Sequence, residues 1–591
     1  MFATALNRLE IESGPVRLAL DERLDQWQAQ NVGRRLWAAD PTVWIVDSDP
    51  AGNIPELSNR LGWLDLPVSM AGLATELENF AAGIRAAGFS RVVVLGMGGS
   101  SLIAEVWSEV FGVVDAGLPL LVLDSTHPLA VAEIGAVETL TEALFLVASK
   151  SGGTLETLSF FNYFYQRLSR LRENPGQNFV ALTDPGSGLE KLAREKGFRR
   201  IFATPATVGG RYSALTAFGL LPAALLGLAP SQLLARAQVM MAAGAAKIAP
   251  RDNPALRLGA FLGELVRAGR DKMGLVLSPR LRPFAVWLEQ LIAESLGKQG
   301  WGLLPVIISE TEAVPRCNRE GRPAEDAFYV FLRLDGDDNR VLDQGHAQVV
   351  EAGLPAALIR LDEPADLAQE LWRFELATAA AGAVLGLNPF DQPDVEAAKQ
   401  GACAVMESWE QAGCLPSPEP LARLAEGRLY GSRHFEKVTD LEQVPVRLLA
   451  LVKPGDYLAL LVYLPRTSEL DRVLARLREH LQAACRVPVT LGYGPRYLHS
   501  TGQLHKGDGN HGVFLQLSGA RTEDLPLPGQ NYGFATMIAA QAQGDYQALL
   551  KAGRRLLALD WETLSPADII RHLERLDEAV ARLVGVENFE V

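Results

Sequence analysis

The feature that most constrains the fold is an alternation, beginning near Val92, of short apolar runs with longer segments of helical period. The apolar runs are rich in β-branched residues. Such continuous runs are typical of strands that are buried on both faces of a parallel sheet. Because strands of this kind alternate with helices, the sequence predicts βαβ units and hence a doubly wound α/β fold.

The alternation occurs in two successive series, with a helical section at residues 212–270 between them. The first series predicts strands at Val92–Leu95, Leu120–Leu123, Leu144–Ala148, Phe179–Leu182 and Ile201–Ala203. The second series predicts strands at Gly274–Leu277, Leu304–Ile308, Ala327–Leu332 and Ala357–Leu361, followed by a long helix around Asp366–Leu385.

A third region follows the linker Cys414–Pro420 and ends in an amphipathic helical tail. Its strand candidates are Tyr457–Leu464, Val487–Leu491 and Val513–Leu517. The predicted organisation is therefore a helical segment at 1–65, two α/β domains at 66–250 and 251–415, and a C-terminal α/β region at 430–591.

Composition limits the partners and the compartment. The 56 Lys and Arg against 70 Asp and Glu give a net charge of −14, which argues against a general nucleic-acid-binding protein. The 4 cysteines are too few and too scattered for a disulfide framework. The start of the chain lacks the pattern of a signal peptide. The stretch most like a membrane span is the uncharged Tyr212–Ala235, but it holds two prolines and its apolar part is too short, so a buried helix pair is expected there. We expect a cytoplasmic protein with no membrane contact.

A glycine-rich turn, LGMGGSS, follows the first predicted strand. Its glycines, Gly99 among them, let the backbone approach a ligand closely, and a helix that begins near Ser100 presents free N–H groups to an anion. The third glycine of a dinucleotide fingerprint is missing, since Ser101 stands there. Asp124, after the second strand, would suit a ribose contact. A dehydrogenase and a simple tight turn therefore both remain open.

A second turn, ASKSGGTLET, combines glycines with hydroxyl groups after the third predicted strand. Ser149, Ser151 and Thr154 offer hydroxyl donors, and the following helix directs the positive end of its dipole at an anion. Lys150 adds a formal positive charge. One hydroxyl here would be an ordinary helix cap, but the cluster favours a phosphate site.

An arginine and a glutamate lie in largely apolar segments. Arg211 follows two glycines and opens the longest uncharged section, where it needs a counter-charge. It is either held by a buried carboxylate or placed to stabilise negative charge in a ligand or transition state. Glu294, within AESLGK, has apolar neighbours that would raise its pKa toward that of a general base, although most helical glutamates are simply solvated.

Two further segments carry polar side chains of chemical interest. NPFDQPDVEAAK places Gln392 at the start of a short helix with Lys399, which by default is a surface lysine. YLHSTGQLHKGDGNHG is a glycine-rich polar loop with His499 and His505. Its one acidic residue is Asp508, so we expect no metal site. A substrate-facing loop and a polar surface loop remain open.

Taken together, these motifs resemble the phosphoglucose isomerase family of the sugar isomerase (SIS) superfamily. The matching segments, in the family's order, are LGMGGSS, SKSGGTLET, VGGRYS, AESLGK and NPFDQPDVEAAK. The resemblance implies two SIS domains, a homodimer, and no metal or redox cofactor. It also implies a glycolytic and gluconeogenic isomerase that interconverts glucose 6-phosphate and fructose 6-phosphate through an enediolate.

The resemblance implies roles for the matching side chains. Those expected to contact the substrate or its phosphate are Gly99, Ser100, Ser149, Lys150, Ser151, Thr154 and Gln392. Glu294 would move the proton between C2 and C1, Arg211 would stabilise the enediolate, and Lys399 would assist ring opening. Lys150, Arg211 and Lys399 would then meet in one positive pocket.

The chain departs from the family pattern in two places. The usual phosphate loop reads SKTFTT, whereas this chain has SKSGGT, closer to other SIS proteins. The family's ring-opening histidine, in a motif like TNGQHAF, is missing, because the one histidine between Glu294 and Lys399 is His346 in a dissimilar segment. We expect His499 or His505 to replace it.

The opening segments RRLWAADPTVW and LGWLDLP and the late YGPRYLHSTGQLHKG resemble the isomerase half of fused transaldolase–phosphoglucose isomerase proteins. No transaldolase barrel fits before the first glycine turn, so we expect the isomerase part alone, with a functional link to a separate transaldolase. The alternatives are a phosphomannose or bifunctional phosphoglucose/phosphomannose isomerase, and a non-catalytic SIS sugar-phosphate sensor.

Overall fold

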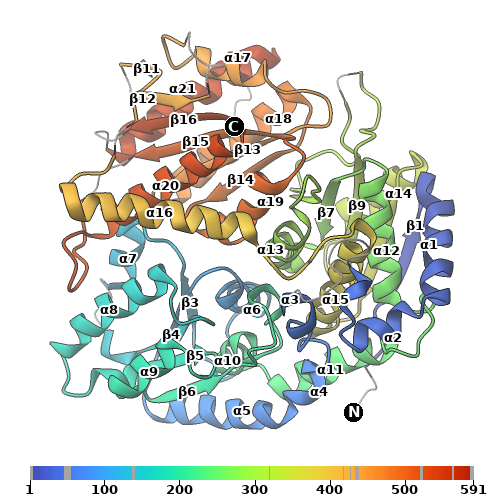
Figure 1. The fold of residues 1–591 in the computed structure, drawn as a ribbon, viewed down its shortest axis with the longest axis horizontal. Helices are drawn as coiled ribbons and strands as arrows, with labels where there is room; N and C mark the ends of the chain where they lie inside the picture. The colour runs from blue at the N-terminus through green and yellow to red at the C-terminus, as the bar shows by residue number, and fades with distance from the viewer. Residues whose placement is uncertain are drawn as a thin grey trace. The chain divides into compact units, whose positions relative to one another are not determined.

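The computed structural model describes residues 4–44, 55–135, 140–318, 320–416, 418–425, 427–432, 438–519, 523–561 and 565–585 (Figure 1). The chain divides into two compact units. The first comprises Met1–Asp124, Glu138–Arg316 and Pro323–Gln392, and the second comprises Ser125–Val137, Cys317–Arg322 and Pro393–Val591. The predicted domain boundaries at 65, 250 and 415–430 stay predictions.

The first sheet, in the first unit, is parallel and has the strand order β3-β2-β4-β5-β6. Its strands are β2 (Arg91–Gly96), β3 (Leu120–Leu123), β4 (Ala143–Ala148), β5 (Phe179–Thr183) and β6 (Arg200–Ala203). Strands β4 and β5 are buried at every residue, as their continuous apolar runs predict. The strands expected in this series are confirmed.

Helices flank this sheet (Figure 1). They are α5 (Ala71–Ala86), α6 (Leu102–Phe111), α8 (Leu155–Ser169), α9 (Gly188–Glu195) and α10 (Ala217–Leu225). Helix α6 directly follows the glycine turn after β2, and α8 directly follows the serine-rich turn after β4. The two turns that the sequence singled out therefore both join a strand to a helix.

The second sheet has the order β1-β10-β9-β7-β8. The predicted parallel strands are β7 (Lys272–Leu277), β8 (Leu304–Ile307), β9 (Ala327–Leu334) and β10 (Ala356–Leu361). The accompanying helices are α11 (Pro230–Ala243), α12 (Pro254–Arg267), α13 (Phe284–Leu296), α14 (Arg340–Glu351) and α15 (Leu367–Leu385). The predicted fold class, an α/β protein with parallel sheets flanked by helices, is confirmed.

One strand of this sheet contradicts the sequence analysis. The expectation of a helical opening missed β1 (Arg8–Glu12), which pairs antiparallel with β10 at the sheet edge. Its sequence RLEIE alternates apolar and charged residues, and its charged side chains are the exposed ones. Charges are a common protection of an edge strand against unwanted pairing. The helices α1 (Arg17–Ala29), α2 (Val32–Trp37), α3 (Pro55–Asn59) and α4 (Leu66–Ser69) follow it.

The third sheet, in the second unit, has the order β11-β12-β16-β15-β13-β14. Its strands are β11 (Ala422–Arg423), β12 (Arg428–Gly431), β13 (Tyr457–Tyr463), β14 (Val489–Tyr493), β15 (Gly512–Gly519) and β16 (Arg555–Trp561). The region ends in the expected amphipathic helix, α21 (Pro566–Val584), but β16 was not among the predicted strands. A short apolar run such as RLLALDW does not by its pattern distinguish a strand from a buried helix.

The described helices of the second unit are α7 (Pro128–Gly135), α16 (Pro393–Ala412), α17 (Gln443–Leu449), α18 (Ser468–Cys485), α19 (Gly502–Gly507), α20 (Phe534–Lys551) and α21 (Pro566–Val584). Two of them correct the sequence analysis. Helix α16 is 20 residues long, not short, and the expected polar loop at 497–512 contains α19. Among the described residues, no helix is long and apolar enough to cross a membrane.

The three sheets share one winding order. In each, the first parallel strand is central, the next strand in the chain lies on one side of it, and the third and fourth lie on the other. The chain direction across the sheet therefore reverses at the central strand, and the crevice at the carboxyl ends of the strands on either side of that point is where ligands bind in open α/β sheets. In the first sheet this point lies between β2 and β4.

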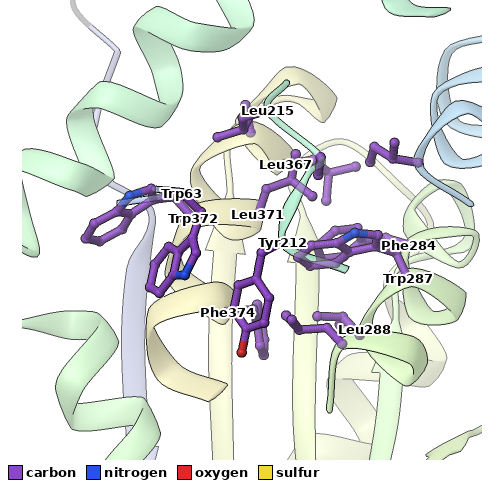
Figure 2. Close-up of a cluster of buried hydrophobic side chains, with 14 of the residues drawn as sticks. Trp63, Tyr212, Leu215, Phe284, Trp287, Leu288, Leu367, Leu371, Trp372 and Phe374 are labelled. Atoms are coloured by element: carbon purple, nitrogen blue, oxygen red, sulfur yellow. The ribbon is translucent and has the colours of Figure 1, made fainter. Parts of the chain in front are cut away.

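A cluster of large side chains forms the core beside the second sheet (Figure 2). Tyr212 stacks on Trp63 with 5.3 Å between ring centroids, and Phe390 meets the same tyrosine edge-on, also at 5.3 Å. Tyr212 follows the arginine of the VGGRYS motif directly. The core therefore fixes the backbone that carries Arg211.

The start of α16 is held by a side chain from α19. The buried Gln503 accepts hydrogen bonds from the backbone N–H groups of Asp394, at 2.9 Å, and Val395, at 3.3 Å. Its own amide N–H donates to the Asp394 carboxylate. Gln503 therefore supplies the N-terminal cap of the helix that carries Lys399.

We expect Gln503→Ala to reduce the free energy of unfolding by about 1–2 kcal/mol, because buried backbone N–H groups lose their acceptor. Hydrogen exchange should quicken in the first turn of α16. Gln547→Ala, at an exposed position on α20, is the matched control, and its effect should stay within about 0.5 kcal/mol. Urea unfolding and exchange mass spectrometry measure both, and equal behaviour of the two variants would contradict the capping role.

Candidate active site

The glycine turn after β2 lies against the segment that carries Arg211. A Cβ atom on Gly99 would lie 2.2 Å from the carbonyl oxygen of Gly210 and 2.9 Å from the amide nitrogen of Arg211. Only glycine permits this approach. The structure thus gives Gly99 a packing role, and it places the half-buried Ser100 next to the arginine segment.

The turn after β4 forms a small cradle of hydroxyl and N–H groups. The hydroxyls of the buried Ser149 and of Thr154 are 2.9 Å apart, and Ser149 accepts a hydrogen bond from Gly152 N–H at 3.2 Å. Thr154 precedes helix α8, but its hydroxyl does not cap that helix. The ordinary capping interpretation therefore fails for Thr154, and the positive end of the α8 dipole faces this turn. Ser151 is exposed at its rim.

Lys150 bonds to groups that lie outside this turn. Its ammonium donates to Asp184 at 2.6 Å and to the carbonyl of Pro205 at 3.1 Å. Burial lowers the pKa of Lys150, and the Asp184 carboxylate partly offsets that effect. Both acceptors follow neighbouring strands, and the ammonium also lies 5.9 Å from the ring centroid of Phe218 on α10, so Lys150 holds the turn in place.

Arg211 is buried and held on several sides. Its Nε donates to Ser295 at 2.8 Å, and one Nη donates to the Gln392 side-chain carbonyl at 3.0 Å. The other Nη donates to the backbone carbonyls of Pro389, at 2.7 Å, and Asp391, at 3.0 Å. Four of the five N–H donors of a guanidinium are thus committed, which fixes the cation rigidly.

Glu294 lies beside this fixed cation on helix α13. Its Oε1 is 3.5 Å from an Nη of Arg211, and both side chains are buried. Its Oε2 accepts a hydrogen bond from Gln290, one turn earlier, at 3.1 Å. The two interpretations of Arg211 are therefore compatible, since the arginine has a buried carboxylate partner and four neutral anchors. A carboxylate next to a rigid cation can remove a proton from carbon while the cation stabilises the resulting oxyanion.

The model of the phosphoglucose isomerase family matches residues 75–330. The glucose-6-phosphate isomerase of Symbiobacterium thermophilum is 32% identical over 395 residues, which cover 58% of this chain and 86% of that protein. The glucose-6-phosphate isomerase of Parabacteroides distasonis is 30% identical over 394 residues, which cover 58% and 87% of the two chains. The chain belongs to the phosphoglucose isomerase family.

Solved structures support the fold of this phosphoglucose isomerase family member. The crystal structure of a glucose-6-phosphate isomerase from Chlamydia trachomatis superposes with a TM-score of 0.52 at 18% identity, and covers 66% of this chain and 85% of that one. A hypothetical protein, TT0462, from Thermus thermophilus gives a TM-score of 0.57 at 24% identity, with 69% and 100% covered. The family assignment replaces the dehydrogenase alternative.

The structure brings some of the predicted site residues of this isomerase family member together. Arg211 contacts both Glu294 and Gln392. The close packing of Gly99 brings the neighbouring Ser100 next to the segment of Arg211. Lys399 lies in the second unit, where it is half-exposed and pairs with Glu396 at 3.0 Å. That Lys399 shares one positive pocket with Lys150 and Arg211 stays a prediction.

The two candidate ring-opening histidines differ in their surroundings. His505 is buried on α19, stacks on Tyr457 and contacts Phe514, with ring centroids 5.7 and 5.2 Å away. Its Nδ1 lies 3.0 Å from the Tyr457 hydroxyl, and burial lowers the pKa of His505 well below its ordinary value. His505 is therefore enclosed by aromatic side chains, and its role in ring opening stays a prediction. His499 is half-buried and remains the better candidate.

Two side chains beside Glu294 were not predicted from the sequence. Gln290 orients its carboxylate, and Lys298 bonds to the segment that holds Arg211. Lys298 is the last residue of the AESLGK motif, which was quoted for its glutamate alone. Spacing offered a signal for Gln290, because residues four apart share a helix face.

A buried carboxyl group on α15 has no evident role in this site. Neither oxygen of Glu375 has a hydrogen-bond partner among the described residues, and burial raises the pKa of Glu375 well above its ordinary value of 4.5. Between 4.5 and that raised pKa the folded protein binds a proton that the unfolded chain has released. This group's contribution to stability is therefore lost as pH rises through that window.

We expect Glu375→Gln to raise the free energy of unfolding relative to wild type at about pH 8, because glutamine is neutral in both states. The gain should shrink toward about pH 4.5, where both chains carry a neutral side chain. Urea unfolding at the two pH values measures the effect. The exposed Glu22→Gln on α1 is the control, and a pH-independent difference between wild type and Glu375→Gln would contradict the assignment.

Proposed function

We infer that this protein is a glucose-6-phosphate isomerase, an aldose–ketose isomerase of glycolysis. The observation that carries the inference is the buried pair of Glu294 and Arg211, in a chain of the phosphoglucose isomerase family. The relatives cited above bear the same activity in their names. A sugar phosphate is accordingly the substrate.

The chemistry follows from the positions of the two charged groups. In open-chain glucose 6-phosphate the Glu294 carboxylate takes the proton from C2, and the electron pair of the broken C–H bond forms the C1–C2 double bond. The carbonyl oxygen at C1 becomes an enediolate oxygen, whose charge Arg211 stabilises. A proton then passes from O2 to O1, and Glu294 returns its proton to C1, which gives fructose 6-phosphate.

The cradle of Ser149 and Thr154 supports binding of the substrate phosphate. It lies at the switch point of the first sheet, at the N-terminus of α8, which the Thr154 hydroxyl does not cap. Binding energy from this remote group would orient C1 and C2 against Glu294. Ser100, Ser151 and Gln392 are proposed as further contacts.

The proposal extends to ring opening, the oligomeric state and a partner enzyme. Lys399 assists ring opening with His499, the half-buried one of the two histidines. The enzyme acts as a homodimer in the cytoplasm, without nucleic acid or membrane. A separate transaldolase is its functional partner, an idea supported by the resemblance of YGPRYLHSTGQLHKG to the fused proteins.

We expect Glu294→Gln to lower kcat about 10³-fold, because the base is removed while the hydrogen bond to Gln290 can persist. Binding of fructose 6-phosphate should stay within about threefold of wild type. A coupled turnover assay and calorimetry measure the two quantities. Absence of turnover in the wild type, with binding intact, would indicate a sugar-phosphate sensor instead of an enzyme.

The same assay separates the isomerase alternatives. The loop SKSGGT differs from the SKTFTT of most family members, which is the observation that favours a wider or different specificity. Glucose 6-phosphate, mannose 6-phosphate and glucosamine 6-phosphate should be compared side by side. Turnover of mannose 6-phosphate at a rate equal to that of glucose 6-phosphate would favour the bifunctional isomerase.

We expect Thr154→Val to raise KM for fructose 6-phosphate roughly tenfold or more and to leave kcat nearly unchanged. The variant keeps the shape of the side chain but loses a hydroxyl, and a hydrogen bond to a charged group contributes about 1.5–3 kcal/mol. Ser169→Ala, at the exposed far end of α8, is the control. An unchanged KM in Thr154→Val would place the phosphate elsewhere.

A further inference from the structure

Lys298 is a buried lysine that the proposed reaction does not use. It follows Gly297, which ends helix α13, and its side chain is 1% exposed. Its ammonium donates to the carbonyl of Asn388 at 2.9 Å, to the carbonyl of Asp391 at 2.5 Å and to the Asp391 carboxylate at 2.7 Å. All three donors of the ammonium are thereby used.

Two cations therefore bind the same short segment. Arg211 contacts the carbonyls of Pro389 and Asp391, and Lys298 contacts those of Asn388 and Asp391. The carbonyl of Asp391 is shared between them. The residue that comes next, Gln392, accepts a hydrogen bond from Arg211. The position of the segment 388–392 thus depends on Lys298 as well as on the arginine.

This arrangement is costly. Burial, together with the positive charge of Arg211, lowers the pKa of Lys298 to about 8, although Asp391 and Glu294 oppose the shift. A second buried cation beside an arginine adds little to the stability of the fold, because apolar side chains of similar size would stabilise it as well or better. Its cost is understandable if the segment must be held in one position beside the reacting groups.

We propose that Lys298 is a positioning residue of the isomerase, which fixes the segment 388–392 and through it the guanidinium of Arg211 beside Glu294. This inference rests on the proposed function. A misplacement of about 1 Å in a catalytic group can lower a rate on the order of 10²-fold. Since Arg211 acts on the charge of the enediolate, the effect belongs to kcat more than to KM.

Lys298→Met tests the proposal against a matched control. Lys272→Met also removes a buried lysine of the first unit, one that is 2% exposed and pairs with Asp271 at 2.5 Å, far from the segment in the chain. We expect kcat to fall on the order of 10²-fold in Lys298→Met with KM within about threefold, and to stay near wild type in Lys272→Met. Lys298→Arg, which keeps a charge and two or more donors, should recover part of the lost kcat.

A kcat of Lys298→Met within about twofold of wild type, or an equal loss in both variants, would overturn the proposal. If Lys298→Met does not fold, Asp391→Asn takes its place, because it weakens one of the three acceptors and should lower kcat in the same way by a smaller factor. An unchanged kcat in that folded variant would overturn the proposal as well.

Hydrogen exchange of residues 388–392 provides a measurement that is independent of turnover. We expect exchange of these residues to be faster than in the wild type in Lys298→Met and to be unchanged in Lys272→Met. If the wild type does not interconvert the two hexose phosphates, the proposed function fails, and the exchange data still decide whether Lys298 holds the segment. Unchanged exchange with normal wild-type turnover would contradict the positioning role alone.

Discussion

The buried guanidinium of Arg211 is the constraint on which the site depends. A charge away from water is tolerated only when hydrogen bonds and an opposite charge compensate it. Here the compensation comes from α13, through Ser295 and Glu294, and from the segment 389–392. Three parts of the chain that are far apart in sequence must therefore meet at one side chain. The packing of Gly99 against Gly210 and the rings around Tyr212 fix the remaining side of it.

The sheets were predictable because most of their strands are buried on both faces. Continuous runs such as those of β4 and β5 have a pattern that surface segments do not share. The strands at the margins of this pattern were missed for different reasons. Strand β1 is short, charged and antiparallel, whereas β16 lies between two helices and its short apolar run was not distinguished from them. A central strand is specified by its own residues, but an edge strand is specified mainly by its neighbour.

The residues of the site likewise fall into those that the sequence predicts and those that it does not. Side chains with one chemical purpose, such as Arg211, Glu294 and Ser149, stand out in a motif because their residue type limits what they can do. Lys298 does not, since its partners are backbone carbonyls whose position no sequence pattern reveals. The burial of His505 could not be inferred from its motif, for the opposite reason. Its neighbours in the sequence are polar, but its neighbours in space are Tyr457, Tyr497 and Phe514.

The repeated winding order shows how a fold can recur without its site. At the switch point of the first sheet, β4 is followed by Ser149 and a turn of small residues, whose hydroxyl and N–H groups form a cradle. The switch point of the third sheet lies between β13 and β15. There β13, which corresponds to β2 of the first sheet, ends in Tyr463, whose hydroxyl bonds to Tyr497 at 3.1 Å. Tyr497 in turn donates to Asp545, which pairs with the buried Lys506 at 2.6 Å. These groups bond to one another at the end of β13, whereas the end of β4 carries the hydroxyl cradle that we propose for the substrate phosphate, so one winding order can serve two purposes.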